Sequence, residues 1–241
     1  MITSTTDERA LRAARNNAEW CEAMCRAHGL PGTFGAHAWT NTRRTPPLYP
    51  DAVTLTPEAP AADVLAGIDA SAVGPGASVK DSFARLNLAA AGFEVLFEAQ
   101  WLYRPAGLPA PAAPEGLPWS PVTTPAELTE WATAWDGGQG LAGLFRPELL
   151  ADPTTTLLAA RDRGGRVTAG AVLSTTAGAA GISNFFTLDD DLDAAWAGCL
   201  SAVTSSCPRL PVVGYEGGDD LTAALRSGCD PAGPLRVWLR A

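Results

Sequence analysis

Two periodicities of apolar and polar residues alternate along the chain, and together they predict an α/β protein. Apolar residues return at helical spacing from Asp7 to His28, where Gly29 and Pro31 break the pattern, so this stretch is expected to be an amphipathic helix. Further helices are expected over residues 61–70, 83–91, 127–135, 192–203 and 221–227. Short runs rich in β-branched residues predict strands over residues 51–55, 77–81, 93–104, 154–161, 166–174, 181–187, 211–215 and 234–240. This interleaving is typical of α/β folds, here of α+β character with mixed sheets.

Proline and glycine divide the chain. Gly164-Gly165, between two strand-like runs, predicts a β-hairpin. Between residues 105 and 118 proline and glycine recur every few positions, which is the composition of a semi-rigid, extended linker. We therefore expect an N-terminal domain over residues 1–105, a linker over 106–117 and a C-terminal domain over 118–241.

An internal repeat indicates that the two halves are related. Residues 78–81 read as a strand, followed by a predicted helix, Gly92 and a strand that ends in Trp-Leu-Tyr-Arg. Residues 212–216 read as a strand, again followed by a helix, a glycine (Gly228) and a strand that ends in Trp-Leu-Arg. The spacings within the two segments agree within a residue or two, which favours a duplication.

The acidic charge is concentrated in two short segments. The net charge is −9, and most of the excess lies in the second half, at residues 189–193 and 216–220. Such a surface repels phosphate backbones, so a nucleic-acid partner is not expected, whereas a cationic small molecule is favoured. A solvated acidic face with no partner is the alternative.

The chain shows no signal for a membrane or for export. No apolar run reaches the length of about 20 residues that spans a bilayer, and the polar N-terminus does not resemble a signal peptide. Five cysteines without paired spacing fit a reducing compartment, so a cytoplasmic location is expected. Cys21, Cys25 and His28 have helical spacing, but buried small thiols explain them better than a metal site, and no metal is expected.

The order of elements resembles the GNAT (N-acetyltransferase) superfamily. Residues 156–186 (TLLAARDRGGRVTAGAVLSTTAGAAGISNFF) are similar to its central antiparallel strands, and residues 210–239 (LPVVGYEGGDDLTAALRSGCDPAGPLRVWL) to its closing strand–helix–strand unit. The likeness covers about residues 120–241, with a weaker copy over 40–105, in a chain whose arginine-rich composition is of an actinobacterial type. The resemblance implies a tandem GNAT fold, acyl transfer, and acetyl-CoA or another acyl-CoA as the donor.

The family's motif for coenzyme A is absent from this sequence. The motif, Arg/Gln-x-x-Gly-x-Gly/Ala, presents backbone N–H groups and a helix N-terminus to the pyrophosphate. Its place in the second half is residues 187–193, which contain four aspartates and neither glycine nor a basic residue. Its place in the first half, residues 56–60, lacks it too, and the family's general-acid tyrosine would fall near Ala224. The residues with which the family binds acyl-CoA are therefore missing from this sequence.

By the same resemblance, the reacting centre lies where the fourth and fifth strands of the fold diverge. In the second half this place holds Ser183 and Asn184 on one strand and Tyr215 and Glu216 on the next. Glu216 is the candidate base for an ammonium substrate, and Tyr215 the candidate donor to a developing charge. Ser183 and Asn184 are candidate substrate-binding residues. Simple packing of Tyr215 and solvation of Glu216 are the alternatives.

In the first half the corresponding strand end carries Lys80, the only lysine of the chain, and Asp81. A desolvated lysine can act as a base or nucleophile or hold a carboxylate. The adjacent pair Arg43-Arg44 is a candidate anion grip, and Trp101 a candidate substrate contact. Solvation of the arginines, core packing of Trp101, and chance survival of one lysine in a GC-rich coding sequence are the alternatives.

These observations favour a GNAT-like acyltransferase that acts on an amine-bearing small molecule and binds its acyl thioester in a non-standard way. The alternative is a GNAT fold that no longer uses coenzyme A, serving as a different small-molecule biosynthetic enzyme or as a non-catalytic binding protein. An enzyme is favoured over a binding protein. The oligomeric state is not indicated.

Overall fold

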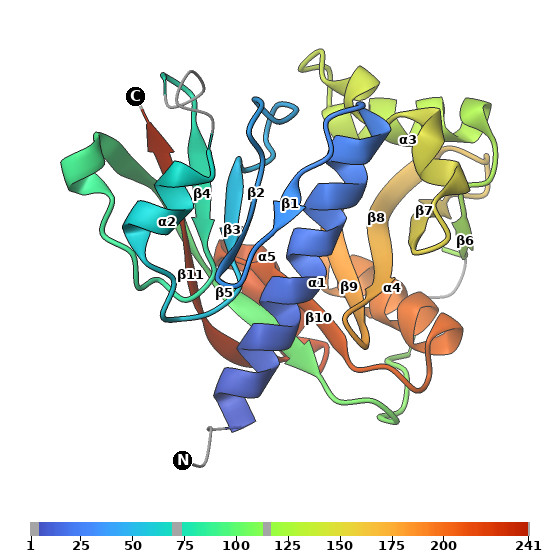
Figure 1. Ribbon diagram of the computed structural model, residues 1–241. Helices are drawn as coiled ribbons and strands as arrows, with labels where there is room; N and C mark the ends of the chain where they lie inside the picture. Colours follow the sequence, from blue (N-terminus) through green and yellow to red (C-terminus); the bar gives the residue numbers. More distant parts are fainter. Residues whose placement is uncertain (1–4, 69–73, 113–116, 241) are drawn as a thin grey trace. The chain divides into compact units, whose positions relative to one another are not determined.

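A computed structural model describes residues 5–68, 74–112 and 117–240, and its helices and strands are labelled in Figure 1. The chain forms two compact units, the first made of Met1–Trp101 with Ala232–Ala241 and the second of Leu102–Pro231. The end of the predicted helix over 61–70 and residues 113–116 of the predicted linker lie outside the described residues. The division at residues 105 and 118 stays a prediction.

The first unit is a mixed sheet with a long helix. Helix α1 (Thr5–Ala27) confirms the amphipathic N-terminal segment. The strands run in the order β1 (Thr33–Phe34), β2 (Ala38–Thr40), β3 (Ala52–Thr54), β4 (Ser78–Asp81), β11 (Asp230–Arg240) and β5 (Phe93–Arg104). Strands β3 and β4 are parallel, whereas β11 pairs antiparallel with β4. Helix α2 (Ala61–Ala66) and the 3₁₀ turn η1 (Ala89–Ala91) complete the unit.

The strands of the second unit run in the order β10 (Val212–Glu216), β9 (Ala179–Thr187), β8 (Val167–Thr176), β7 (Thr155–Arg161) and β6 (Trp119–Pro121). All neighbours are antiparallel except β9 and β10, which are parallel. Its helices are α3 (Pro125–Asp136), α4 (Leu192–Ser206) and α5 (Gly218–Arg226), with the 3₁₀ turns η2 (Ala142–Leu144) and η3 (Pro147–Ala151). The mixed α/β class predicted from the sequence is confirmed.

One predicted helix is wrong. Residues 83–91 contain only the short turn η1, and Ala84 before it adopts a left-handed φ of 52°. The Asp81 carboxylate accepts hydrogen bonds from the backbone N–H of Phe83 and of Leu86, and this fixes an irregular loop in place of a first helical turn. Aspartate commonly competes with helix formation in this way.

Each unit has its own core. In the first unit the core contains Val79, Phe93 and Trp238, so the last strand of the chain completes a core begun by residues near its start. In the second unit Trp196, Leu200 and Val203 of α4 pack on apolar residues of β8, β9 and β10. None of the helices in the described ranges is long and apolar enough to cross a bilayer.

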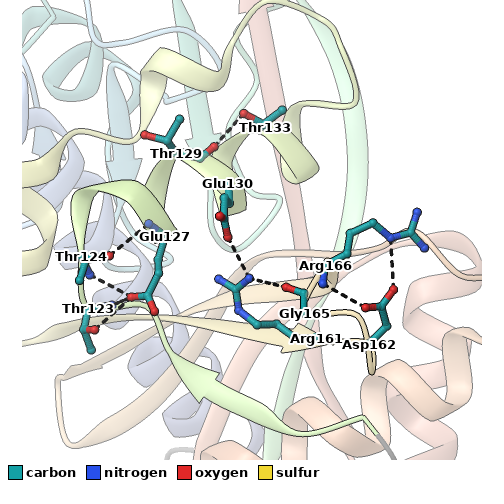
Figure 2. A network of polar contacts seen from close by, with 10 residues as sticks. All are labelled: Thr123, Thr124, Glu127, Thr129, Glu130, Thr133, Arg161, Asp162, Gly165 and Arg166. Atoms are coloured by element: carbon teal, nitrogen blue, oxygen red, sulfur yellow. Dashed lines mark hydrogen bonds and ion pairs between the residues drawn. The ribbon is translucent and has the colours of Figure 1, made fainter.

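Helix α3 is held at both its start and its middle by polar contacts of the second unit (Figure 2). Thr124 and Glu127 form a capping box, in which the Thr124 hydroxyl accepts from the Glu127 N–H and the Glu127 carboxylate accepts from the Thr124 N–H. Further along, Glu130 forms a 2.9 Å ion pair with Arg161 of β7, and Arg161 also donates to the Gly165 carbonyl in the predicted hairpin turn. The middle of the helix and the hairpin are thereby tied together.

The two repeated segments end in matching contacts, but with their last strands exchanged. Gly92 and Gly228 both adopt left-handed φ angles, 81° and 92°. A Cβ on Gly92 would lie 3.7 Å from Nε of Arg240 within the first unit, and one on Gly228 would lie 3.7 Å from Nε of Arg104 within the second. In sequence, however, Gly92 precedes the strand that ends at Arg104, and Gly228 the strand that ends at Arg240. The symmetry supports related halves, which stay an inference.

Candidate active site

The candidate site of the second unit lies where β9 and β10 diverge. The two strands pair in parallel at Val212–Ala180 and Val213–Gly181, and no pairing of the two is recorded beyond these positions in the described chain. Gly214 lies at the point of divergence, where a Cβ would come 3.1 Å from the Ile182 carbonyl oxygen. The sequence interpretation placed the reacting centre at this end of the two strands, and that placement stays a prediction.

A β-bulge shapes the β9 side of the site. The β8–β9 register passes from Gly170–Phe186 to Val172–Ser183, so β9 contains one extra residue between Ser183 and Phe186. Asn184 accommodates the bulge with a φ of 50°, a left-handed conformation that asparagine tolerates better than most residues. Bulges bend a strand and redirect its backbone groups, and they are frequent next to active sites. Ser183 and Asn184 are both half-buried at this bend.

The β10 side supplies a carboxyl group with an unusual proton affinity. Glu216 is half-buried, and desolvation of its carboxyl, followed by the charge of Asp220, raises its pKa to about 8. Asp220 accepts a 3.2 Å hydrogen bond from the indole of Trp196, whose ring stacks on Phe185 at 4.2 Å. An opposite charge placed between the two carboxyl groups would relieve their repulsion and lower the pKa of Glu216 again. Tyr215 is half-buried on the same strand.

The two acidic segments lie at the same edge of the second sheet. Residues 189–193 follow β9 and residues 216–220 end and follow β10, and these two strands are parallel neighbours, so their carboxyl ends point the same way. The first turn of α4 is also linked to the last residue of α5, by the Asp193–Arg226 ion pair at 3.2 Å. The candidate site therefore lies beside an edge rich in carboxylates.

The start of α4 is occupied by the chain's own aspartates. Asp191 is the N-cap of the helix, and its carboxylate accepts a 3.0 Å hydrogen bond from the N–H of Ala194. Asp193 forms the ion pair with Arg226, and the Asp189 N–H donates to the Thr187 hydroxyl. One of the N–H groups that could bind an anion at this helix start is thus already bonded to a carboxylate of the chain.

The candidates of the first half take part in structural contacts. Lys80 is buried, with 5% of its surface exposed, and its Nζ donates to the Asn17 side-chain oxygen at 2.8 Å. Asp81 holds the loop that follows β4, as described above. Trp101 is fully buried, and its indole donates to the Ser82 carbonyl oxygen.

The predicted arginine pair is likewise engaged by protein groups. Arg44 forms a 2.7 Å ion pair with the buried Asp51, and Arg43 donates to the Gly29 carbonyl oxygen. Sequence reasoning did not anticipate these partners. Sequence reasoning also did not predict that Asp220 and Trp196 form part of the surroundings of Glu216, although the acidic run 216–220 was identified.

The five cysteines are unpaired thiols, and all but Cys207 are buried. Burial raises the pKa of the Cys199 thiol well above its ordinary value, and it raises the pKa of Cys229 to about 12. Among the residues that the structure describes, no group of three or more metal-ligating side chains is close enough to hold an ion.

Comparison with known proteins establishes the fold. The sequence matches no family model and no curated protein. Among solved structures it is similar to a GCN5-related N-acetyltransferase from Kribbella flavida, with a TM-score of 0.64, 18% identity and 95% of each chain covered. A conserved protein of unknown function from Staphylococcus epidermidis gives a TM-score of 0.60, 12% identity, and 84% and 83% coverage. A GCN5-related N-acetyltransferase-like protein from Streptococcus suis gives a TM-score of 0.54 and 13% identity, with 97% of this chain and 99% of that chain covered.

The chain therefore has the GNAT fold, as the resemblance predicted. The fold implies coenzyme A, but the residues at the start of α4 do not fit it. A pyrophosphate needs unoccupied N–H groups and a positive field, whereas the Ala194 N–H is capped by Asp191 and the neighbouring side chains are aspartates.

Proposed function

We propose that the protein is an acyltransferase that moves an acyl group from a thioester to the amino group of a small, cationic molecule, with the reacting centre in the second unit. The observation that carries the proposal is the end of the β9–β10 pairing, which lies between the bulge at Asn184 and the carboxyl of Glu216. The GNAT fold of its structural neighbours supports the reaction class. The acidic edge supports a cationic acceptor.

In this proposal each residue of the candidate site has a role. Redirected backbone groups at the bulge polarise the thioester carbonyl. Glu216 first takes one proton from the bound ammonium ion, which leaves a neutral amine. The amine nitrogen then forms a C–N bond to the carbonyl carbon, the C–S bond breaks, and the second proton lost by the nitrogen goes to the departing thiolate, which leaves as the thiol. A bound ammonium ion lowers the pKa of Glu216, so the base becomes ionised when the acceptor is present. Tyr215 donates to the developing charge.

A thioester-dependent assay tests this function. Purified protein is incubated with acetyl thioesters and a panel of primary amines, and thiol release is followed with a chromogenic reagent. We expect amine-dependent thiol release that Glu216→Gln lowers at least about tenfold, since general bases contribute about 10²–10⁴-fold. Glu148→Gln, an exposed carboxylate on η3, is the matched control and should retain activity.

The second candidate function is a GNAT fold without thioester chemistry, either another biosynthetic enzyme or a ligand-binding protein. The capped start of α4 is the observation that favours it. It predicts heat of binding from a cationic amine with no thiol release from any thioester. Lys80, Asp81, Arg43, Arg44 and Trp101 stay proposals for the first unit, where a carboxylate-bearing ligand would be their substrate class.

A further inference from the structure

A cavity of about 620 Å³ lies in the second unit, between strand β6 and helix α4. Strand β6 is the last strand in the order of the sheet, and it pairs with β7, where Trp119 lies opposite Ala160 and Pro121 opposite Leu158. The cavity reaches inward to Leu158, of which only 2% is exposed, so it is more than a shallow depression of the surface. Its volume lies within the range of about 300–1,000 Å³ that is usual for small-molecule sites.

The cavity exists because large residues of β6 face small residues of α4. Trp119 and Pro121 are two positions apart on β6, so their side chains point to the same face of the sheet. On α4, Gly198, Ser201 and Ser205 recur at spacings of three and four residues and line the same cavity. Side chains of this size leave the space beside the indole and the proline ring open.

The indole of Trp119 forms one wall of the cavity and has an unsatisfied donor. Its Nε1–H is buried and has no hydrogen-bond acceptor among the described residues. A Cβ on Gly198 would lie 2.4 Å from Nε1, so the edge of the ring rests directly on the backbone of α4. Buried N–H groups without a partner are rare in native proteins. Because glycine leaves the ring free to tilt over α4, an oxygen atom of a ligand in the cavity can supply the missing acceptor.

The polar groups of the cavity are uncharged. None of the described residues that line it has a charged side chain, and the hydroxyls of Ser201 and Ser205 add two neutral hydrogen-bonding groups to the indole N–H. A neutral cavity offers no compensation for the desolvation of an ion. The net charge of −9 disfavours an anion further. The lining therefore selects an uncharged molecule.

We propose that this cavity is a binding site for an uncharged small molecule that has an apolar body and at least one carbonyl or hydroxyl oxygen. The body packs against Trp119, Pro121 and Leu158, and the oxygen accepts a hydrogen bond from the Trp119 indole. The site lies along the middle and last turns of α4, whereas the candidate active site borders the first turn, so the two sites are distinct. The inference does not depend on the proposed acyltransferase function.

The test uses two probes that share a ring system and differ in charge, the neutral ketone acetylnaphthalene and the carboxylate naphthoate. The full chain is labelled with a nitrogen isotope for NMR, and the Trp119 indole signal is assigned as the one that Trp119→Phe removes. Titration with acetylnaphthalene should move this signal downfield and saturate at one probe per chain, because the N–H acquires an acceptor. Naphthoate should bind at least about tenfold more weakly, since the cavity does not compensate for the loss of its hydration.

Two variants that fill the cavity locate the site. Ser201→Phe adds a ring at a half-buried lining position, and Ser205→Phe adds one at an exposed lining position, where the fold is least at risk. Each should weaken the binding of acetylnaphthalene at least about tenfold, because the probe loses its apolar burial. Thr222→Phe, which also replaces a hydroxyl side chain at an exposed helical position, is the matched control on α5 and should leave the affinity unchanged. Urea midpoints show which variants are folded.

Each part of the proposal has a result that would overturn it. The absence of a saturable shift of the Trp119 signal with acetylnaphthalene would show that the cavity takes no such molecule. Naphthoate binding as tightly as acetylnaphthalene would overturn the selection of an uncharged ligand. Undiminished affinity in the folded filling variants would place the probe somewhere other than between β6 and α4. None of these measurements involves thiol release, so they leave the proposed acyltransferase function to its own assay.

Discussion

At the scale of single residues, Glu216 links stability to the pH at which the site can work. Its pKa is raised from an ordinary value of 4.5 to about 8 by burial and by Asp220. The folded protein therefore retains a proton that the unfolded chain loses between these values, so stability falls as pH rises from about 4.5 to about 8 and then levels off.

Replacing Glu216 by glutamine should remove this pH dependence. Glu216→Gln should unfold much like the unaltered protein at pH 5 and be more stable at pH 9 by at least about 1 kcal/mol, since each pKa unit is worth about 1.4 kcal/mol. Urea unfolding at both pH values measures the difference, with the exposed Glu148→Gln as control. Equal shifts in the two variants would show that the Glu216 carboxyl is not desolvated.

Lys80 offers a second test at this scale. Because it is buried between the neighbours Val53 on β3 and Val237 on β11, a broader guanidinium should be hard to place. Lys80→Arg should lower the free energy of unfolding by about 1–3 kcal/mol, the usual result of overpacking. Arg85→Lys, an exchange at an exposed position, should change it little. Lost ligand binding with an unchanged urea midpoint would contradict a packing role and favour a functional one.

At the scale of elements, the packing of β8 against the core depends on one glycine. A Cβ on Gly170 would lie 2.3 Å from Nε1 of the buried Trp131 and 2.5 Å from the Phe186 ring. Trp131 is held there by a hydrogen bond to the Leu158 carbonyl oxygen. Gly170→Ala should therefore cost about 2–4 kcal/mol, somewhat above ordinary overpacking, because the indole cannot yield without losing that bond.

The control for this substitution is Gly143→Ala, where a Cβ would meet no atom within 4 Å and no left-handed φ is required. Thermal unfolding should separate the two variants by several degrees. Similar midpoints for both would mean that the core around Trp131 adapts to the extra methyl group.

The capping box at the start of α3, seen in Figure 2, can be tested by substitution. Thr124→Ala leaves the Glu127 N–H without its side-chain acceptor and should destabilise the protein by about 1 kcal/mol. Thr133→Ala, an exposed position inside the same helix, removes a hydroxyl that bonds only to the Thr129 carbonyl oxygen and should be neutral or slightly stabilising. If both substitutions cost the same, the cap does not set the start of α3.

Elements with a strong periodicity of apolar residues were predictable from the sequence, whereas segments whose conformation depends on one polar side chain were not. The spacing of apolar residues predicts helix α1 and strands β7 to β11, and the composition predicts the Gly164-Gly165 turn. The loop after β4 was missed because the Asp81 carboxylate outweighs a helical pattern over residues 83–91. In the site, Tyr215 and Glu216 could be placed from the strand end, but the extra residue at Asn184 and the Asp191 cap depend on pairings that a single sequence does not display.

At the scale of the whole molecule, the last strand belongs to the first unit. Ending the chain at Pro231 would remove the partner of β4 and the Trp238 ring from the core that contains Val79 and Phe93. We expect hydrogen exchange to show lost protection in β3 and β4, with β7 to β9 still protected. Lost protection confined to β7 to β10 would instead favour a C-terminal domain over residues 118–241.

The place of β11 also bears on how the protein is made. A nascent chain leaves the ribosome N-terminus first, and its domains ordinarily fold in that order. Here the segment that completes the first unit is synthesised after the second unit. The whole second unit must be translated in between, which takes on the order of ten seconds at about 5–20 residues per second. During that interval β4 has an open edge, so the first unit is the part of the nascent protein that chaperones would have reason to hold.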